Sequence, residues 1–432
     1  MSSTSTDLWE RVDSALNEIR PYIHSHAGDV NIVDVDDEGV VKLQMVGTCH
    51  GCPMSMLTLR LGIERILTEK VEGVTRVISI KPDDFDYPEL EPADAFIIAV
   101  PTPLRGSEQR PSPDLSYVES AVHSIGPVLK SGDLVVLEST SPVGTTQWIS
   151  ELLAQLRPDL TFPHQKGELA MVQIAHCPER VLPGRILEEV INNPRVIGGL
   201  TRKCAQRALA LYRIFARGEC RVTMARTAEL SKLTENAFRD VNIAFANELA
   251  LVCDRLKINP WELIKLANLH PRVNILQPGP GVGGHCIAVD PWFVIATNPE
   301  ETKLIRAARE INDARPEFVC GKVRSCASAL KSPVIACLGL SYKRDVDDLR
   351  ESPAVEIVRR LAEERVGQLL VVEPHISALP PELAKLGLEL HDFDMAIERA
   401  NVVLLLVDHM SFLQIDRNVL NDKIVIDTRG VW

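Results

Sequence analysis

The sequence predicts an α/β protein of several domains, in which a small α+β unit precedes two regions of parallel sheet. The chain has 432 residues, which exceeds the length of one ordinary domain. From residue 95 onward, short and fully apolar segments alternate with helical patterns, as is typical of buried parallel strands. These segments cover residues 95–101, 134–140, 334–340, 369–374, 402–408 and 424–430.

The first 80 residues follow a different pattern, which predicts a small unit of helices and strands. Residues 8–27 start as an amphipathic helix, and Pro21 ends it. Two alternating segments with an acidic turn between them then predict a hairpin. The remaining predicted elements are the hairpin strands 30–35 and 40–46, a helix over 54–69 and a strand near 74–80.

Changes of pattern along the chain predict its division into units. Residues 81–94 are rich in proline and acidic side chains and predict a linker. Residues 201–268 predict nearly continuous helix between the two sheet regions. The predicted units are residues 1–80, 81–94, 95–200, 201–315 and 316–432.

Composition and charge exclude several classes of function. A formal net charge of −12 argues against nucleic acid or an anionic membrane as the main partner, because binding phosphates draws on excess Lys and Arg. No apolar run reaches the roughly 18 residues that a membrane helix needs. The polar, acidic N-terminus does not resemble a secretory signal. Ten cysteines are too few for a disulfide scaffold, so the sequence predicts a cytoplasmic protein with free, metal-bound or nucleophilic thiols.

Cys49 and Cys52 form a C-x-x-C motif in a loop between a predicted strand and a predicted helix. Such a pair can hold zinc, bind an iron–sulfur cluster, exchange disulfides or consist of inert thiols. The helix N-terminus is expected to lower the pKa of both thiols, which suits ligation and redox chemistry alike. His24 and His26 are further candidate zinc ligands.

Residues 7–80 resemble the C-terminal (Nfu) domain of NifU. The resemblance rests on I-R-P, G-D-V, G-T-C-H-G-C-P and T-L-R-L-G-I-E in that order, with Ala27 departing from the usual glycine. It implies a [4Fe–4S] cluster and iron–sulfur donor or acceptor proteins as partners. Such a cluster takes four thiolates and one chain offers Cys49 and Cys52, so the cluster is expected to be shared between two chains.

Residues 270–292 contain a second chemical motif around Cys286. Gly279, Gly281 and Gly284 spell G-x-G-x-x-G, but the dinucleotide fingerprint follows a strand and opens a helix, whereas this segment is a loop with several prolines. We therefore expect these glycines to let the backbone pack closely around Cys286 and its substrate. The alternative is that Cys286 is an inert small hydrophobe.

The predicted helix over residues 227–252 carries Lys232, Asn236 and Asp240 on one stripe, four residues apart. A solvated helix face and a functional face are both compatible with this spacing.

Residues 90–432 resemble the UDP-glucose/GDP-mannose dehydrogenase family, in the branch that acts on UDP-N-acetylmannosamine. The motifs, in family order, are AVPTP (99–103), LESTSPVG (137–144), CPERVLPG (177–184), AELSKLTENAFRDVNIAFANEL (228–249), PRVNILQPGPGVGGHCIAVDP (271–291), GLSYKRDVDDLRESPA (339–354) and VIDTRGVW (425–432). The resemblance implies NAD-dependent oxidation of the sugar C6 alcohol to a carboxylate in two hydride transfers, with a UDP-sugar as substrate.

The same resemblance implies roles for individual residues. Cys286 would be the nucleophile that holds the aldehyde, while Lys232 and Asn236 would stabilise the oxyanion. Asp290 and a water near Thr140 would move protons, and Glu179 would be the acid–base group of hydrolysis. The implied contacts are Arg272 and Lys343 to the sugar nucleotide, and Thr102 and Thr140 to NAD.

Residues 1–90 contain no strand–G-x-G-x-x-G–helix unit, which family members have at their start. This predicts that residues 95–200 are a truncated NAD-binding domain with weakened NAD affinity and exposed apolar sheet edges. Residues 201–315 would be a helical middle domain, and residues 316–432 a UDP-sugar-binding domain. The resulting hypotheses are a dehydrogenase with an added iron–sulfur module, an iron–sulfur carrier with an inactive dehydrogenase remnant, and an artificially joined gene. A homodimer is expected in each case.

Overall fold

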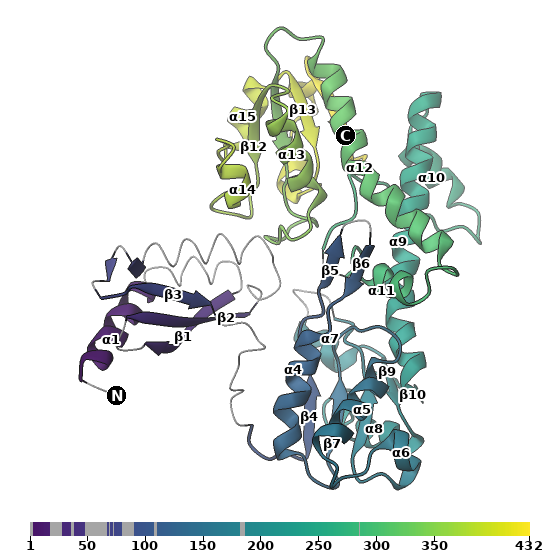
Figure 1. Cartoon of the computed structure of the whole chain (residues 1–432). Coiled ribbons are helices and arrows are strands. Elements are labelled where there is room, and N and C mark those ends of the chain that lie inside the picture. Colours follow the sequence, from purple (N-terminus) through teal and green to yellow (C-terminus); the bar gives the residue numbers. More distant parts are fainter. Residues whose placement is uncertain are drawn as a thin grey trace.

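The computed structural model describes residues 3–17, 28–35, 39–47, 67–68, 70–71, 73–79, 90–107, 110–181, 186–284 and 286–432. It confirms the α/β class. A small sheet near the N-terminus is followed by a five-stranded sheet, a set of long helices and a second sheet at the C-terminus (Figure 1). None of the described helices is long and apolar enough to cross a membrane.

The N-terminal sheet has the order β1-β2-β3, formed by β1 (Gly28–Val35), β2 (Val40–Gly47) and β3 (Arg76–Ser79). β1 and β2 are the predicted hairpin, and β3 runs parallel to β2. α1 (Ser3–Asn17) buries Val12 and Leu16 in the same apolar cluster as strand residues, so the predicted helix and strands are present. The predicted helix over 54–69 lies almost wholly outside the described residues, as do Cys49, Cys52, His24 and His26.

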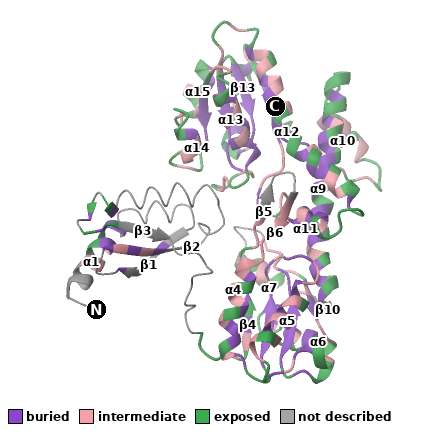
Figure 2. Cartoon of the chain, viewed as in Figure 1, coloured by how far each residue is buried: buried purple, intermediate pink, exposed green. Residues whose placement is uncertain are grey.

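The five-stranded sheet has the order β10-β9-β8-β7-β4. All neighbouring strands are parallel except β8 and β9. β7 is buried along its whole length, which explains its continuous apolar run, and β8 is equally buried although it carries Gln173 and His176. Figure 2 shows buried residues in the interior of this region, between its helices. Among the strands described for this sheet, β4 is an edge strand, and Ile97 on it is exposed. The strands are β4 (Ala95–Ile98), β7 (Leu134–Leu137), β8 (Gln173–His176), β9 (Arg195–Gly199) and β10 (Cys220–Met224).

Helices cover both faces of this sheet. Val135 and Leu137 of β7 join one apolar cluster with α4 (Ser116–Ile125) and α5 (Thr145–Leu156). Leu134 and Val136 face α8 (Arg202–Tyr212) on the other side. Three further elements of the region are β5 (Leu104–Ser107) and β6 (Arg110–Pro113), which form a hairpin, and α7 (Ile186–Asn192).

The middle of the chain is dominated by two long helices that pack side by side. α9 (Ala225–Leu256) has 32 residues and α12 (Lys303–Ala327) has 25. Two shorter helices, α10 (Pro260–Ala267) and α11 (Asp290–Thr297), contact α9. The prediction of nearly continuous helix over 201–268 is wrong at β10, a strand whose residues are mostly exposed and therefore lack an apolar run.

The C-terminal sheet is fully parallel and has the order β12-β11-β13-β14. Its strands, β11 (Val334–Leu338), β12 (Gln368–Val372), β13 (Val402–Leu405) and β14 (Ile424–Asp427), lie where the sequence predicts them. α12 and α13 (Pro353–Glu363) pack on one face, and α15 (Phe393–Arg399) packs on the other. The chain switches direction between β11 and β13, where open α/β sheets form a crevice.

Candidate active site

Four of the predicted catalytic residues lie together where α11 begins beside α9. Cys286 is in the turn before α11, and its carbonyl accepts the backbone N–H of Asp290 at 2.9 Å. The Asn236 side-chain amide of α9 donates to the Asp290 carboxylate at 2.5 Å. Lys232 lies one helical turn before Asn236 and acts electrostatically on both Asp290 and Cys286. The structure therefore joins Cys286, Asp290, Asn236 and Lys232 in one site.

Asp290 is buried, with 3% of its surface exposed. Burial raises the pKa of its carboxyl to about 6, although the Asn236 hydrogen bond and the charge of Lys232 oppose this rise. A carboxylate with this pKa is a stronger base than an ordinary aspartate and exchanges protons close to neutral pH. It is therefore suited to general acid–base chemistry.

Cys286 is exposed to solvent, yet the surrounding protein atoms and charges still change the pKa of its thiol. Burial against these atoms raises the pKa of the Cys286 thiol, and the nearby carboxylate of Asp290 raises it further. The positive charges of Lys232, Arg239 and Arg350 lower it. A negative charge on Asp290 therefore disfavours a thiolate on Cys286, and the three positive charges favour it.

Asp240 has a different role from Lys232 and Asn236, with which it shares a stripe of α9. Its buried carboxylate accepts from Arg309 of α12 at 2.6 Å and from Asn312 at 2.8 Å. Burial raises the pKa of Asp240, and the Arg309 guanidinium lowers it. The stripe is therefore not a solvated face: Asn236 points to Asp290, and Asp240 fixes α9 to α12.

The glycine-rich loop packs closely against the C-terminal region, whereas the sequence predicts close packing around Cys286 and its substrate. A Cβ on Gly281 would lie 2.7 Å from Pro353, and one on Gly283 would lie 2.5 Å from the carbonyl oxygen of Glu351. Gly284 has φ of +80°, and its missing Cβ would meet the Tyr342 ring at 2.9 Å. These glycines thus hold the segment that leads to Cys286 against α13 and the loop after β11.

Thr102 and Thr140 lie together at the carboxyl ends of β4 and β7. The Thr102 hydroxyl donates to the carbonyl oxygen of Thr140 at 2.6 Å, and the Ser139 hydroxyl donates to that of Val100 at 2.6 Å. The neighbouring Ser141 hydroxyl is buried and has no hydrogen-bond partner among the described residues. A buried hydroxyl without a partner at the carboxyl edge of a parallel sheet fits a polar group of a dinucleotide.

A buried carboxylate on α9 holds the loop that carries Thr140. Glu229 accepts from the backbone N–H of Gly144 at 2.7 Å and from that of Thr146 at 2.8 Å. It also accepts from the Thr146 hydroxyl at 2.5 Å. Burial raises the pKa of Glu229, and these donors lower it. Glu229 is not predicted as a functional residue from the sequence, although it lies three residues before Lys232 and seven before Asn236 on the same stripe.

Three other predicted residues have no described contact with Cys286. Glu179 follows β8, and its carboxylate lies 3.7 Å from the Arg195 guanidinium. Lys343 is exposed in the loop after β11, and Arg272 is exposed in the segment after α10. The backbone N–H of Arg272 donates to His270.

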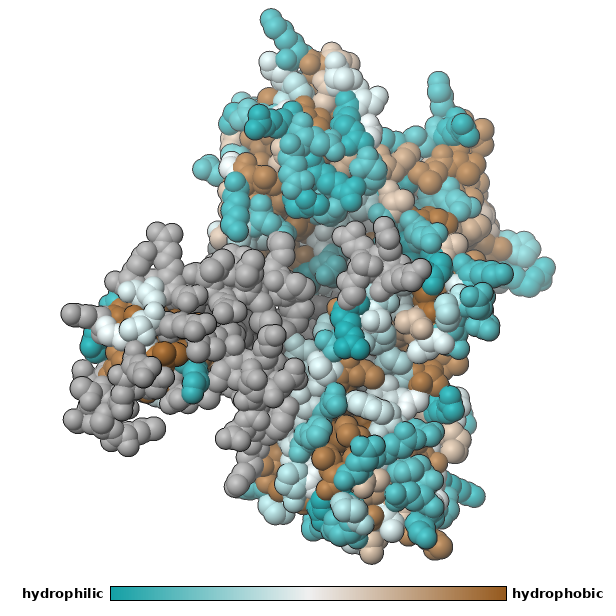
Figure 3. All heavy atoms as spheres, viewed as in Figure 1, coloured by the Kyte–Doolittle hydropathy of each residue, from teal (hydrophilic) through white to brown (hydrophobic). Residues whose placement is uncertain are grey.

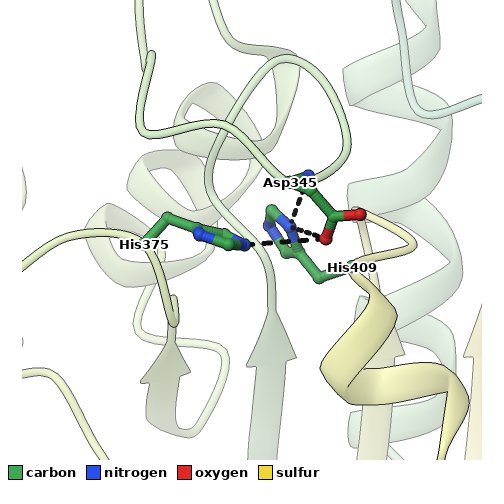
Figure 4. Close-up of side chains that lie close together, drawn as sticks. All are labelled: Asp345, His375 and His409. Carbon is green, nitrogen blue, oxygen red and sulfur yellow. Dashed lines mark hydrogen bonds and ion pairs between the residues drawn. The ribbon is translucent and has the colours of Figure 1, made fainter.

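Asp345, His375 and His409 form the one group in the described part of the chain that could hold a metal ion (Figure 4). Their ligand atoms lie within 4.8 Å of one another, on loops after β11, β12 and β13. However, Nδ1 of His409 accepts the Asp345 backbone N–H at 2.9 Å, and its Nε2 lies 3.1 Å from the Glu373 carboxylate. Since both ring nitrogens of His409 have partners, we interpret the group as a link between three loops.

Comparisons with known proteins extend over most of the chain. Three models of the UDP-glucose/GDP-mannose dehydrogenase family match: the NAD binding domain over residues 22–216, the central domain over 226–314 and the UDP binding domain over 336–432. An NDP-N-acetyl-D-galactosaminuronic acid dehydrogenase of Ralstonia nicotianae is 60% identical over 344 residues, which are 80% of each chain. A UDP-N-acetyl-D-mannosamine dehydrogenase of Yersinia pestis is 56% identical over 378 residues, 86% of this chain and 87% of the relative.

Solved structures give the same fold. UDP-D-ManNAc dehydrogenase from Pyrococcus horikoshii has a TM-score of 0.69 at 36% identity, covering 86% of this chain and 83% of its own. The UDP-N-acetyl-mannosamine dehydrogenase Cap5O from Staphylococcus aureus has a TM-score of 0.68 at 37% identity, covering 88% and 87%.

The family match corrects the interpretation of the N-terminal region. Because the NAD-binding-domain model matches residues 22–216, the expectation of an Nfu domain fused to a dehydrogenase with a truncated NAD-binding domain is wrong. The NAD-binding domain is present, and the comparisons show no Nfu domain. A [4Fe–4S] cluster at Cys49 and Cys52, iron–sulfur protein partners, an inactive remnant and a joined gene all depended on that expectation and lose their support.

Replacing Glu229 with alanine is expected to loosen the N-terminus of α5. The change removes the acceptor of three hydrogen bonds, and a buried donor left without a partner costs about 1–3 kcal/mol. We expect faster hydrogen exchange in residues 140–150 and a lower Tm, with Glu300→Ala at an exposed position as the control. Unchanged exchange in this segment would show that Glu229 does not hold it.

Asp290→Asn and Lys232→Met are expected to shift the pKa of Cys286 in opposite directions. Loss of the Asp290 charge lowers this pKa and loss of the Lys232 charge raises it. At neutral pH, iodoacetamide should therefore alkylate Cys286 faster in Asp290→Asn and more slowly in Lys232→Met than in the parent chain. Peptide-resolved mass spectrometry gives the rates, with Cys220 as the internal control. Shifts in the same direction would contradict the assignment of these charges.

Proposed function

We propose that this chain, which belongs to the UDP-glucose/GDP-mannose dehydrogenase family, oxidises the C6 alcohol of a UDP-N-acetylhexosamine to a carboxylate with NAD. The observation that carries the proposal is the cluster of Cys286, Asp290, Asn236 and Lys232. It combines a nucleophile, a base with a pKa of about 6 and two donors for an oxyanion.

UDP-N-acetyl-D-mannosamine is the substrate that we propose first. The relatives from Yersinia pestis and Escherichia coli, and the solved structures from Pyrococcus horikoshii and Staphylococcus aureus, are named for this sugar. The N-acetylgalactosamine nucleotide is the second candidate, because the Ralstonia relative at 60% identity is named for the galactosaminuronic acid.

The proposed chemistry assigns each residue of the cluster a step. Asp290 accepts the proton of the C6 hydroxyl as the alcohol loses a hydride and becomes an aldehyde. The Cys286 sulfur then bonds to the aldehyde carbon, and the thiol proton passes to the aldehyde oxygen to give a thiohemiacetal. Loss of a second hydride from carbon and of the hydroxyl proton leaves a thioester on Cys286. Water cleaves the carbon–sulfur bond, which releases the carboxylate and restores the thiol. Lys232 and Asn236 stabilise the negative oxygen at the tetrahedral stages.

The two ligands are proposed to bind on opposite sides of this cluster. NAD, which supplies the hydride acceptor, would be held by Thr102, Thr140 and the unpaired Ser141 hydroxyl. Lys343 and Arg272 would offset the charge of the UDP pyrophosphate. Glu179 is proposed as the acid–base group of hydrolysis, with a water near Thr140. The roles of Glu179, Arg272 and Lys343 rest on their motifs.

We further propose that the chain forms a homodimer through an apolar stripe of α9. Phe238, Phe245 and Val252 follow one another at intervals of seven residues and are 65%, 50% and 49% exposed. Leu256 of α9 and Leu269 after α10 are also exposed, and Figure 3 shows apolar residues at the right of the view, where Figure 1 places α9 and α10. A contiguous exposed stripe of large apolar residues marks an interface, and a second copy offers a self-complementary surface.

The substrate proposal predicts NAD-dependent turnover by the full-length chain. With UDP-N-acetyl-D-mannosamine, NADH absorbance should rise by two equivalents per sugar, and UDP-N-acetyl-D-galactosamine serves as the competing substrate. Cys286→Ala should abolish formation of the carboxylate, and Lys232→Met should lower kcat by about 10²–10³-fold. Cys220→Ala is the control. Carboxylate formation that survives in Cys286→Ala, or turnover of neither sugar, would refute the proposal.

The dimer proposal predicts that a charge on the stripe separates the subunits. Phe245→Glu should convert the chain to a monomer in light scattering coupled to size-exclusion chromatography, because a desolvated carboxylate without a partner opposes burial. Leu187→Glu on α7, where the parent residue is 82% exposed, is the matched control and should not change the mass. A parent chain that is already monomeric would exclude this interface.

A further inference from the structure

A cavity of about 400 Å³ lies between the central helices and the C-terminal sheet, apart from the Cys286 cluster. Its walls come from α9, α10, α12 and β14. The volume is within the range of small-molecule sites. The lining includes Asp254, Trp261, Arg315, Phe318, Lys322 and Ile424.

Arg315 brings a buried positive charge to this cavity and has no ion-pair partner among the described residues. Only 6% of the residue is exposed, and its Nε donates to the carbonyl oxygen of Gly279 at 3.1 Å. Its Nη1 is buried without a hydrogen-bond partner, and no carboxylate of the described residues forms an ion pair with it. The Phe318 ring lies 4.8 Å from the guanidinium and compensates only part of the cost of burial. Burial lowers the pKa of Arg315 to about 10, and the negative charge of Asp254 opposes this shift.

Trp261 brings a second unused donor to the same cavity. Its indole Nε1 is buried and has no partner among the described residues. The ring is held firmly, because the Gly430 backbone packs on it so closely that a Cβ there would lie 2.2 Å from the ring. The segment around Gly430 is fixed in turn by the Asp427 carboxylate, which accepts the backbone N–H groups of residues 429–432.

We propose that this cavity binds a small organic monocarboxylate, whose oxygens accept from Arg315 Nη1 and Trp261 Nε1 and whose apolar part lies against Phe318 and Ile424. Buried donors without partners are rare, and an acceptor ligand would satisfy both. Four charged residues line the cavity: Asp254 is paired with Lys322, and the Asp427 carboxylate accepts backbone N–H groups, so Arg315 is the cation without an ion-pair partner among these described residues. Because two carboxylates already line the cavity, a monoanion adds less repulsion there than a phosphate dianion does.

The ligand would also act on the segment that leads to Cys286. The guanidinium of Arg315 donates to the carbonyl oxygen of Gly279 through Nε, while Asn247 of α9 accepts the backbone N–H of the same glycine at 2.9 Å. A carboxylate on Nη1 would fix the guanidinium in this orientation. We therefore expect occupancy of the cavity to slow hydrogen exchange in residues 277–284.

Calorimetric titration of the full-length chain with benzoate tests the proposal without requiring turnover. Benzoate should bind with one site per chain, while benzamide, its neutral analogue, and inorganic phosphate should bind at least about 10-fold more weakly. Trp261→Phe retains the ring and removes the donor, so it should weaken benzoate about 10-fold. Trp148→Phe on α5 is the matched control, and Arg315→Met should abolish binding.

The outcomes separate this site from the proposed active site. Benzoate affinity that Cys286→Ala leaves unchanged and Trp261→Phe reduces supports the cavity, whatever the result of the substrate assay. No binding, equal binding of benzamide or phosphate, or insensitivity to Trp261→Phe overturns the proposal. If Arg315→Met does not fold, Trp261→Phe with the hydrogen-exchange measurement decides the question.

Discussion

The carboxylate of Glu229 ties the sheet that carries Thr102 and Thr140 to the helix that carries Lys232 and Asn236. It accepts hydrogen bonds at 2.7, 2.8 and 2.5 Å from the start of α5, and all three cross from one element of the structure to another. α9 extends about 48 Å from its first to its last residue. Along that length Asp240 is paired with Arg309, and Asn247 holds Gly279. One helix therefore sets the distances between the proposed cofactor edge, the Cys286 cluster and the glycine-rich loop.

Strands and helix faces that arise from local sequence patterns could be predicted. Contacts between residues that are far apart in the sequence could not. Buried parallel strands such as β7 and β11 follow from apolar runs, and the α9 stripe follows from four-residue spacing. The same spacing could not distinguish a solvated face from a polar network. What decides the role of Asp240 is Arg309, 69 residues away, and a local pattern does not contain that contact. β10 escaped prediction because its exposed residues give no apolar run.

In the N-terminal region, the sequence predicts the secondary structure correctly but not the domain to which these residues belong. The hairpin, the first helix and the final strand were predicted correctly, since turn residues and alternation determine them locally. Short motifs around Cys49 then suggested a separate domain. The match of the NAD-binding-domain model over residues 22–216 overrules that suggestion. A C-x-x-C loop has several physical uses, so its spacing could not decide which domain these residues belong to.

The Cys286 cluster carries a cost in stability that its proposed chemistry explains. An Asp290 pKa raised from 3.8 to about 6 means that the folded state binds a proton more tightly than the unfolded state. Stability is therefore lost as pH rises through this window, by about 3 kcal/mol once Asp290 is ionised. An apolar residue at this position would not cause this loss of stability. Asp290 instead remains ionised beside Cys286, where a carboxylate of this basicity can take the proton of the C6 hydroxyl. The raised pKa of the Cys286 thiol fits the same proposal, because burial and the negative charge of Asp290 both disfavour a thiolate beside the ionised base.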